Sequence, residues 1–268
     1  MASATERVNE AADRARPELR WSGQVVYALF SIGSLLLIWQ VAALIADQPR
    51  LMPPPAIVFG RLGEEFASGD LVHHLAITLA RVAASFVIAM VVGTAVGLIM
   101  GRSSRIDALG QPWLLFFLNL PALVLIVLAY IWIGLTEAAA ITAVALNKIP
   151  NVAVTIREGA RALDPKLGEM ARVFGISTQA TLRQVILPQL LPYVAAAARS
   201  GLALIWKIVL VVELLGRSNG VGFQIGLFFQ LFDVASILAY ALAFILIVLA
   251  IEWCLLQPAE RRLTRWRT

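Results

Sequence analysis

The chain has 268 residues, of which 60% are hydrophobic and 15% are charged, and its mean hydropathy is +0.81. A soluble domain of this size carries more polar surface, so the composition excludes an ordinary soluble protein. The formal net charge is +5, but the basic residues stand between apolar segments rather than in one patch. This arrangement is typical of a membrane protein and argues against a nucleic-acid-binding surface.

Apolar segments long enough to cross a membrane recur along the chain. A spanning helix needs about 20 mainly apolar residues. Six segments meet or approach this length: 25–46, 75–100, 113–135, 138–154, 190–212 and 234–251. The third and fourth are joined by the short turn 134–137, which predicts an antiparallel pair. We expect an all-α integral membrane protein with six transmembrane helices in residues 25–257, an N-terminal tail 1–24 and a basic C-terminal tail 258–268.

The distribution of Lys and Arg predicts the orientation, because these residues accumulate on the cytoplasmic side. With the N-terminus inside, fifteen of the 22 basic residues fall in inner segments and three in outer segments. We therefore expect both termini in the cytoplasm. Gly93, Gly97 and Gly101 lie four residues apart on the second span and so share one face. Small residues at this spacing let another helix approach closely, either within one subunit or between two copies.

A polar segment, residues 164–188, separates the fourth span from the fifth. Asp164 suits a helix N-cap, Pro165 the first turn and Gly175 the end. The apolar residues between them follow the spacing i, i+3, i+4 and i+7 and form one stripe: Leu167, Met170, Ala171 and Phe174. A second short helix is expected to begin at Ser177 or Thr178 and to end at Pro188, because proline lacks a backbone N–H. The two helices form either a knob for a soluble partner or a pair lying flat on lipid.

The spacing in this segment resembles the cytoplasmic EAA signature of bacterial ABC importer permeases. That signature is Glu-Ala-Ala, three residues, Gly, nine residues, Ile, one residue and Leu-Pro. The chain matches it from Glu169 to Pro188, with Met170 in place of an alanine and Val185 in place of isoleucine. The resemblance implies that residues 164–175 form a coupling helix seated in a groove of a separate ATPase subunit. The implied coupling residues are Leu167, Glu169, Met170, Ala171, Arg172, Phe174, Gly175, Leu187 and Pro188.

Residues 50–256 are similar to one branch of these permeases, the nitrate/sulfonate/taurine/bicarbonate type, most clearly in the segments 119–141 and 202–225. The resemblance implies a bacterial inner-membrane complex of two permease copies, two ATPase subunits and a periplasmic substrate-binding protein. A pair of different permeases remains an alternative to a homodimer. The chain itself is expected to bind no cofactor, because none of its three lysines lies in a phosphate-binding loop. ATP and Mg are then bound by the partner ATPase.

Polar groups inside the spans are costly in lipid and are therefore candidate pathway residues. Lys207 lies near the middle of the fifth span, and we interpret it as facing the translocation cavity and favouring an anion; an ion pair with Glu213 or Glu137 is the alternative. Asn119 indicates either a pathway lining or a plain kink. Glu213 and Arg81 are also pathway candidates. Arg81 lies near a span end, which predicts a side chain that snorkels to the membrane surface.

Two other classes fit the sequence less well. An ion-coupled secondary transporter remains the alternative, although no Asp lies within a proposed span. An integral-membrane enzyme would need a catalytic set, but His73 and His74 are adjacent and stand without a Cys or His cluster. We expect neither a catalytic nor a metal site. The expected function is the permease subunit of an ATP-driven importer for a small anion, with ATP hydrolysis on another subunit.

Overall fold

The computed structural model describes residues 19–258, and residues 1–18 and 259–268 lie outside the described part. Most of both predicted tails therefore lies outside it. The described residues form helices and turns without β-strands. The first helix, α2 (Leu19–Ala46), begins before the predicted start at residue 25. The all-α prediction is confirmed.

Five helical segments of the described chain are long and apolar enough to span a membrane. Four are formed by α2, α4 (Asp70–Arg102), α7 (Glu137–Arg161) and α12 (Val234–Ile251), and the fifth is centred on α10 (Leu187–Gly216). A bent pair, α5 (Ser104–Asn119) and α6 (Ala122–Ile133), makes a sixth if it is counted as one span. The remaining elements are α3 (Pro55–Ser68), α8 (Pro165–Val173), α9 (Thr178–Thr181), the π-helix η1 (Leu182–Ile186), α11 (Val221–Gln230) and the π-helix η2 (Glu252–Leu256).

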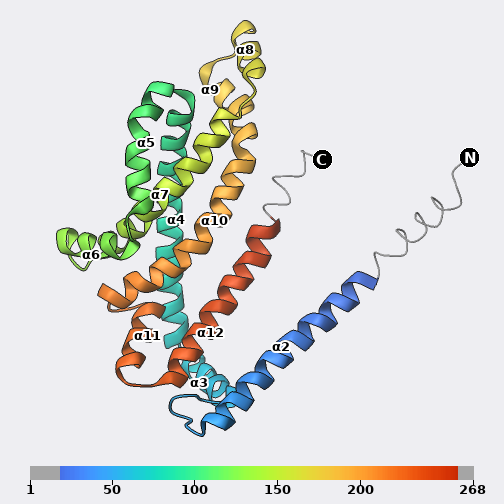
Figure 1. Cartoon of the computed structure of the whole chain (residues 1–268), viewed down its shortest axis with the longest axis vertical. Coiled ribbons are helices and arrows are strands. Elements are labelled where there is room, and N and C mark those ends of the chain that lie inside the picture. Colours follow the sequence, from blue (N-terminus) through green and yellow to red (C-terminus); the bar gives the residue numbers. More distant parts are fainter. Residues whose placement is uncertain (1–18, 259–268) are drawn as a thin grey trace, which may run out of the picture.

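The bundle places two sets of short elements at opposite ends (Figure 1). The coupling end consists of α8, α9 and η1, and the other end carries α3 and α11. Between them run α4, α7 and α10, while α2 diverges from the bundle and meets it mainly at α3. Most described side chains of α2 are exposed in the single chain.

The tightest helix packing joins α4 to α7 along the predicted glycine face. A Cβ added at Gly93 would lie 2.6 Å from Cβ of Val152, and one added at Gly97 would lie 2.5 Å from the carbonyl oxygen of Ala153. One added at Gly101 meets α7 as closely. Of the two predicted alternatives, a helix contact within one subunit or between two copies, the glycines therefore form the first, a packing seam within one subunit.

The third predicted span is not straight, because its two halves are bent by 95°. Leu120, between the halves, has an extended backbone with φ −75° and ψ 122°. Pro121 explains this conformation, since proline disfavours helical geometry in the preceding residue. The Asn119 side chain donates to the carbonyl oxygen of Leu115 at 2.7 Å and so closes the first half.

The prediction that a helix ends at Pro188 is wrong, because the helical segment continues from Thr178 to Gly216. The wider turn of η1 makes this possible. There the Leu187 N–H donates to the carbonyl oxygen of Leu182, five residues back. Pro188 then falls in the first turn of α10, where a missing N–H costs little.

Candidate functional site

The coupling end is built around α8, whose limits follow from its caps. The Asp164 carboxylate accepts a hydrogen bond from the backbone N–H of Lys166 at 2.9 Å. Gly175 has φ +62°, a conformation that glycine adopts without strain. The Ile176 N–H then donates to the carbonyl oxygen of Ala171 at 2.9 Å. The predicted helix over residues 164–175 is confirmed in position and in its capping residues.

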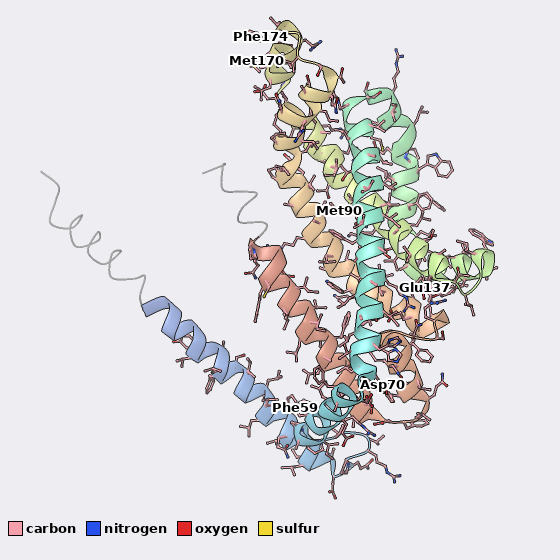
Figure 2. The ribbon with its side chains drawn as sticks, turned by 180° about the vertical axis from the view of Figure 1, so that it is seen from behind. Phe59, Asp70, Met90, Glu137, Met170 and Phe174 are labelled. Atoms are coloured by element: carbon pink, nitrogen blue, oxygen red, sulfur yellow. The ribbon has the colours of Figure 1, made fainter. Side chains whose placement is uncertain are left out.

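The apolar stripe of α8 is largely uncovered. Ala171 is 1% exposed and faces its own chain, whereas Phe174 is 76% exposed, and Leu167 and Met170 are also exposed. Figure 2 shows Met170 and Phe174 at the far tip of the molecule. The other predicted coupling residues are exposed or half-buried around it: Glu169, Arg172, Gly175, Leu187 and Pro188. A contiguous apolar tip of this kind is typical of a surface that contacts a partner protein or the membrane.

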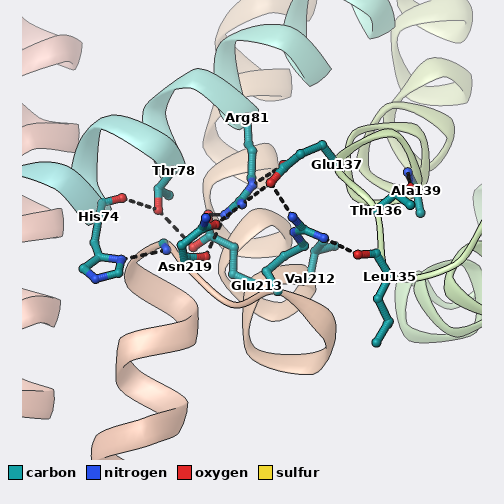
Figure 3. Close-up of polar contacts among 12 residues, drawn as sticks. His74, Thr78, Arg81, Leu135, Thr136, Glu137, Ala139, Val212, Glu213 and Asn219 are labelled. Carbon is teal, nitrogen blue, oxygen red and sulfur yellow. Dashed lines mark hydrogen bonds and ion pairs between the residues drawn. The ribbon is translucent and has the colours of Figure 1, made fainter.

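The opposite end contains a buried ionic network centred on Arg81 of α4 (Figure 3). Arg81 is 3% exposed, and one of its terminal nitrogens donates to Glu213 of α10 at 2.7 Å. The other donates to Glu137, the first residue of α7, at 2.6 Å. Glu137 also pairs with Arg217. We call this set of four residues the Arg81 network.

The loop between α10 and α11 closes over the Arg81 network. The backbone N–H of Gly222 donates to Glu213, which is fully buried, at 2.9 Å. The N–H of Val221 donates to the Thr78 hydroxyl, and that of Gly220 donates to Nδ1 of His74, each at 2.9 Å. A Cβ on Gly222 would collide with the carbonyl oxygen of Leu210, so only glycine allows this approach. The network therefore ties α4, α7, α10 and this loop together.

Two sequence predictions about charges are wrong. Arg81 does not snorkel to the surface, because two carboxylates hold it inside the protein. The alternative in which Lys207 pairs with Glu213 or Glu137 also fails, because these carboxylates pair with arginines. Lys207 is exposed on α10, and it makes no hydrogen bond or ion pair with the residues that the structure describes.

Sequence reasoning assigned no definite role to several polar groups that the structure places at close contacts. Thr78 and Asn219 form hydrogen bonds with members of the Arg81 network, and His74 accepts one from the loop over it, but all three are ordinary polar residues in the sequence. Lys148 of α7 is buried, and a Cβ on Gly201 of α10 would lie 3.3 Å from its Cε. Its charge within a span was the available signal. Asn119 is exposed at the bend between α5 and α6.

The two ends define a class of protein. A bundle of membrane-spanning helices carries an uncovered apolar tip at one end and an ionic brace at the other, which fits a transport subunit that works with partners. The model of the family described as "Binding-protein-dependent transport system inner membrane component" matches residues 72–256. The chain belongs to this family, and it is a permease subunit of an ABC importer.

Known proteins of this class resemble the chain over most of its length. It is 29% identical to the putative aliphatic sulfonates transport permease protein SsuC of Bacillus subtilis, covering 99% of this chain and 96% of that protein. It is also 29% identical to the taurine transport system permease protein TauC of Escherichia coli, covering 97% of each. An inward-facing structure of the MetNI methionine ABC transporter shares the fold, with a TM-score of 0.61, 20% identity and coverage of 76% of this chain and 99% of that one.

Proposed function

We propose that this chain forms half of the pathway through which an ATP-driven importer moves a small anion, of the sulfonate, taurine, nitrate or bicarbonate kind. A periplasmic binding protein delivers the anion, and two copies of the chain form the pathway in the bacterial inner membrane. Two separate ATPase subunits bind ATP and Mg and hydrolyse the nucleotide. Both termini of the chain lie in the cytoplasm, on the same side as the coupling end.

The observation that carries the anion preference is the position of Lys207. It is exposed on α10, nine residues before the helix ends at Gly216, which is about 13 Å along the axis. This distance is close to half of the roughly 30 Å thickness of a bilayer core. A charge facing lipid at that depth costs about 3 kcal/mol or more. Lys207 therefore faces a water-filled pathway, where its ammonium group attracts an anion.

Lys148 supports the same preference. Its side chain passes Gly201 on α10, which lies six residues, or about 9 Å along the helix, before Lys207. The two lysines thus lie at similar depths in the membrane, and neither pairs with a carboxylate of the described residues. Asn119 remains a proposed lining residue, whereas Arg81 and Glu213 support the pathway from inside the Arg81 network.

The exposed stripe of α8 supports coupling to an ATPase. Capped at both ends and anchored through buried Ala171, α8 presents Met170 and Phe174 outward as a rigid unit. A groove on the ATPase that encloses these side chains can move α8, and through it the spanning helices, when ATP binds. The missing phosphate-binding loop in this chain is consistent with that division of labour.

Uptake by the reconstituted transporter tests the anion proposal. Lys207→Met removes the charge at similar length, and we expect slower uptake of the transported anion with an unchanged thermal unfolding temperature. Lys207→Arg keeps the charge and serves as the matched control, so it should retain most of the uptake. Wild-type uptake and selectivity in Lys207→Met would contradict the proposal.

A further inference from the structure

A cavity of about 630 Å³ lies between α8 and the ends of the spanning helices. Arg102, the last residue of α4, lines one side, and Arg172 of α8 lines another. The other polar residues of its lining are Asp164, Thr178, Thr181 and Gln189. The cavity is therefore lined by both the coupling helix and the transmembrane bundle.

The two arginines of this cavity have no partner among the described residues. Nearby arginines at the same end differ, since Arg157 and Arg161 both pair with Asp107. Asp164 also lines the cavity, but its carboxylate accepts the Lys166 N–H and caps α8. Two arginines that line one cavity and have no carboxylate partner favour an oxyanion, which can accept charge-assisted hydrogen bonds from both.

The other polar groups of the lining set the orientation of such a ligand. The Gln189 side chain already forms two hydrogen bonds within the protein. It accepts from the Asp164 N–H at 3.0 Å and donates to the carbonyl oxygen of Val185 at 2.9 Å. The Thr178 hydroxyl makes no hydrogen bond with the described residues and is available as a donor. The oxyanion is therefore expected near Arg102, Arg172 and Thr178, away from Gln189.

The floor of the cavity is apolar and belongs to a core cluster. Ala160 and Ile186 of this cluster line the cavity, together with Leu163, which packs against the cluster. A volume of about 630 Å³ is within the range of sites for whole small molecules and exceeds the need of a single phosphate group. A cationic rim over an apolar floor suits a ligand with an anionic group and an attached apolar part.

We propose that this cavity binds a phosphate group, with Arg102 and Arg172 as its ligands. The phosphate of an anionic lipid fits the combination of cationic rim and apolar floor, and basic pockets at the cytoplasmic ends of spanning helices hold such headgroups in other membrane proteins. Free inorganic phosphate presents the same oxyanion chemistry. Because Arg102 lies on α4 and Arg172 on α8, the bound phosphate ties the coupling helix to the bundle.

Thermal unfolding of the purified full transporter tests this site. The transporter, in a neutral detergent, is titrated with short-chain phosphatidylglycerol, short-chain phosphatidylcholine and inorganic phosphate. We expect phosphatidylglycerol to raise the unfolding temperature and phosphatidylcholine to leave it unchanged. Arg102→Gln and Arg172→Gln should each raise the half-saturating concentration about tenfold, the loss expected for one charge-assisted hydrogen-bonding partner.

Arg105→Gln is the matched control, because Arg105 is an exposed arginine of the same turn and does not line the cavity. It should bind phosphatidylglycerol as the wild type does, and Arg102→Lys should recover part of the lost affinity. Stabilisation by inorganic phosphate with the same dependence on Arg102 assigns the site to the free ion, and stabilisation by phosphatidylglycerol alone assigns it to lipid. Equal binding by Arg102→Gln, Arg172→Gln and Arg105→Gln would overturn the proposal.

Discussion

The two ends of the bundle treat their charged groups in opposite ways. In the Arg81 network, an arginine with a 4% exposed side chain meets two carboxylates, and one of these carboxylates is fully buried. At the coupling end, Arg102 and Arg172 have no partner among the described residues, and Phe174 is exposed. The buried charges of the first end are paired within one chain, whereas the arginines and the apolar tip of the second end are open to other molecules.

This difference matters for a protein that transmits motion. A buried ion pair is costly to disrupt, because removing one partner leaves an uncompensated charge in a medium of low polarity. The Arg81 network can therefore act as a fixed brace for α4, α7 and α10. An exposed apolar tip gains free energy only when a partner covers it, so its position responds to that partner.

The largest expected effect comes from breaking the brace. Arg81→Met leaves the buried Glu213 carboxylate without its cation, and we expect the free energy of unfolding to fall by about 3–5 kcal/mol. Unfolding of the purified protein in denaturant measures this loss. Arg105→Gln, which removes an exposed arginine, should change stability by less than about 0.5 kcal/mol. Equal stability of the two variants would contradict a structural role for the network.

At the coupling end we expect the reverse pattern. Phe174→Ala should leave the stability of the isolated permease within about 0.5 kcal/mol of the wild type, because the side chain is exposed. It should weaken ATPase binding by about 2–4 kcal/mol, as expected for an aromatic anchor in an interface. Binding of the permease to the ATPase subunit measures the loss, with the exposed Gln179 of α9 changed to Ala as control. Unchanged affinity would place the partner elsewhere.

The packing seam between α4 and α7 runs between the two ends of the bundle. Adding a methyl group in this seam tests how closely the two helices must pack. Gly97→Ala places a methyl group 2.5 Å from the Ala153 carbonyl oxygen, so the helices must separate. We expect a loss of about 1–3 kcal/mol in unfolding free energy, as for other overpacked contacts. Gly33→Ala meets no atom within 4 Å and should be neutral or stabilising. A stable Gly97→Ala variant would show that the seam is loose.

The smallest effect concerns pH at the end that carries α3. Burial raises the pKa of Asp233. Hydrogen bonds from Ser236 and the charge of Arg61 lower this pKa by a larger amount, so the pKa lies below its ordinary value. The carboxylate therefore adds stability above about pH 3.9, its unfolded value, and this stability is lost as the pH falls through the folded-state pKa. Asp233→Asn should cost less than about 1 kcal/mol at neutral pH, because the ion pair is partly exposed.

Thermal unfolding as a function of pH measures this difference, which should shrink as the pH falls below about 4. Asp47→Asn, which removes an exposed carboxylate, is the control variant. A difference between Asp233→Asn and the wild type that stays constant down to acid pH would contradict the assigned cause.

Local signals in the sequence predicted much of the fold. The caps at Asp164 and Gly175 predicted α8 because each acts through its immediate neighbours. The spacing of Gly93, Gly97 and Gly101 predicted a close helix contact for the same reason. The exception is Pro188, whose local preference to end a helix is overcome by the π-turn before it.

Contacts between distant residues could not be read in this way. Arg81 is separated by 56 residues from Glu137 and by 132 from Glu213, and no local pattern indicates which charges meet. The sequence placed Arg81 near a span end, where an arginine side chain usually snorkels to the membrane surface. In the structure, tertiary contacts hold this side chain inside the protein instead. The unpaired state of Lys207 among the described residues likewise became visible only in the structure, where Glu137 and Glu213 pair with arginines.

The most direct test of the account asks whether a partner covers the tip of α8. Cys254 is the single cysteine, so Cys254→Ser gives a background for introducing Phe174→Cys or, as control, Gln179→Cys. Labelling with a maleimide is compared between the isolated permease and the assembled transporter. We predict that assembly protects Phe174→Cys from labelling and leaves Gln179→Cys reactive. Equal labelling of Phe174→Cys in both states would contradict the claim that α8 couples this permease to its ATPase.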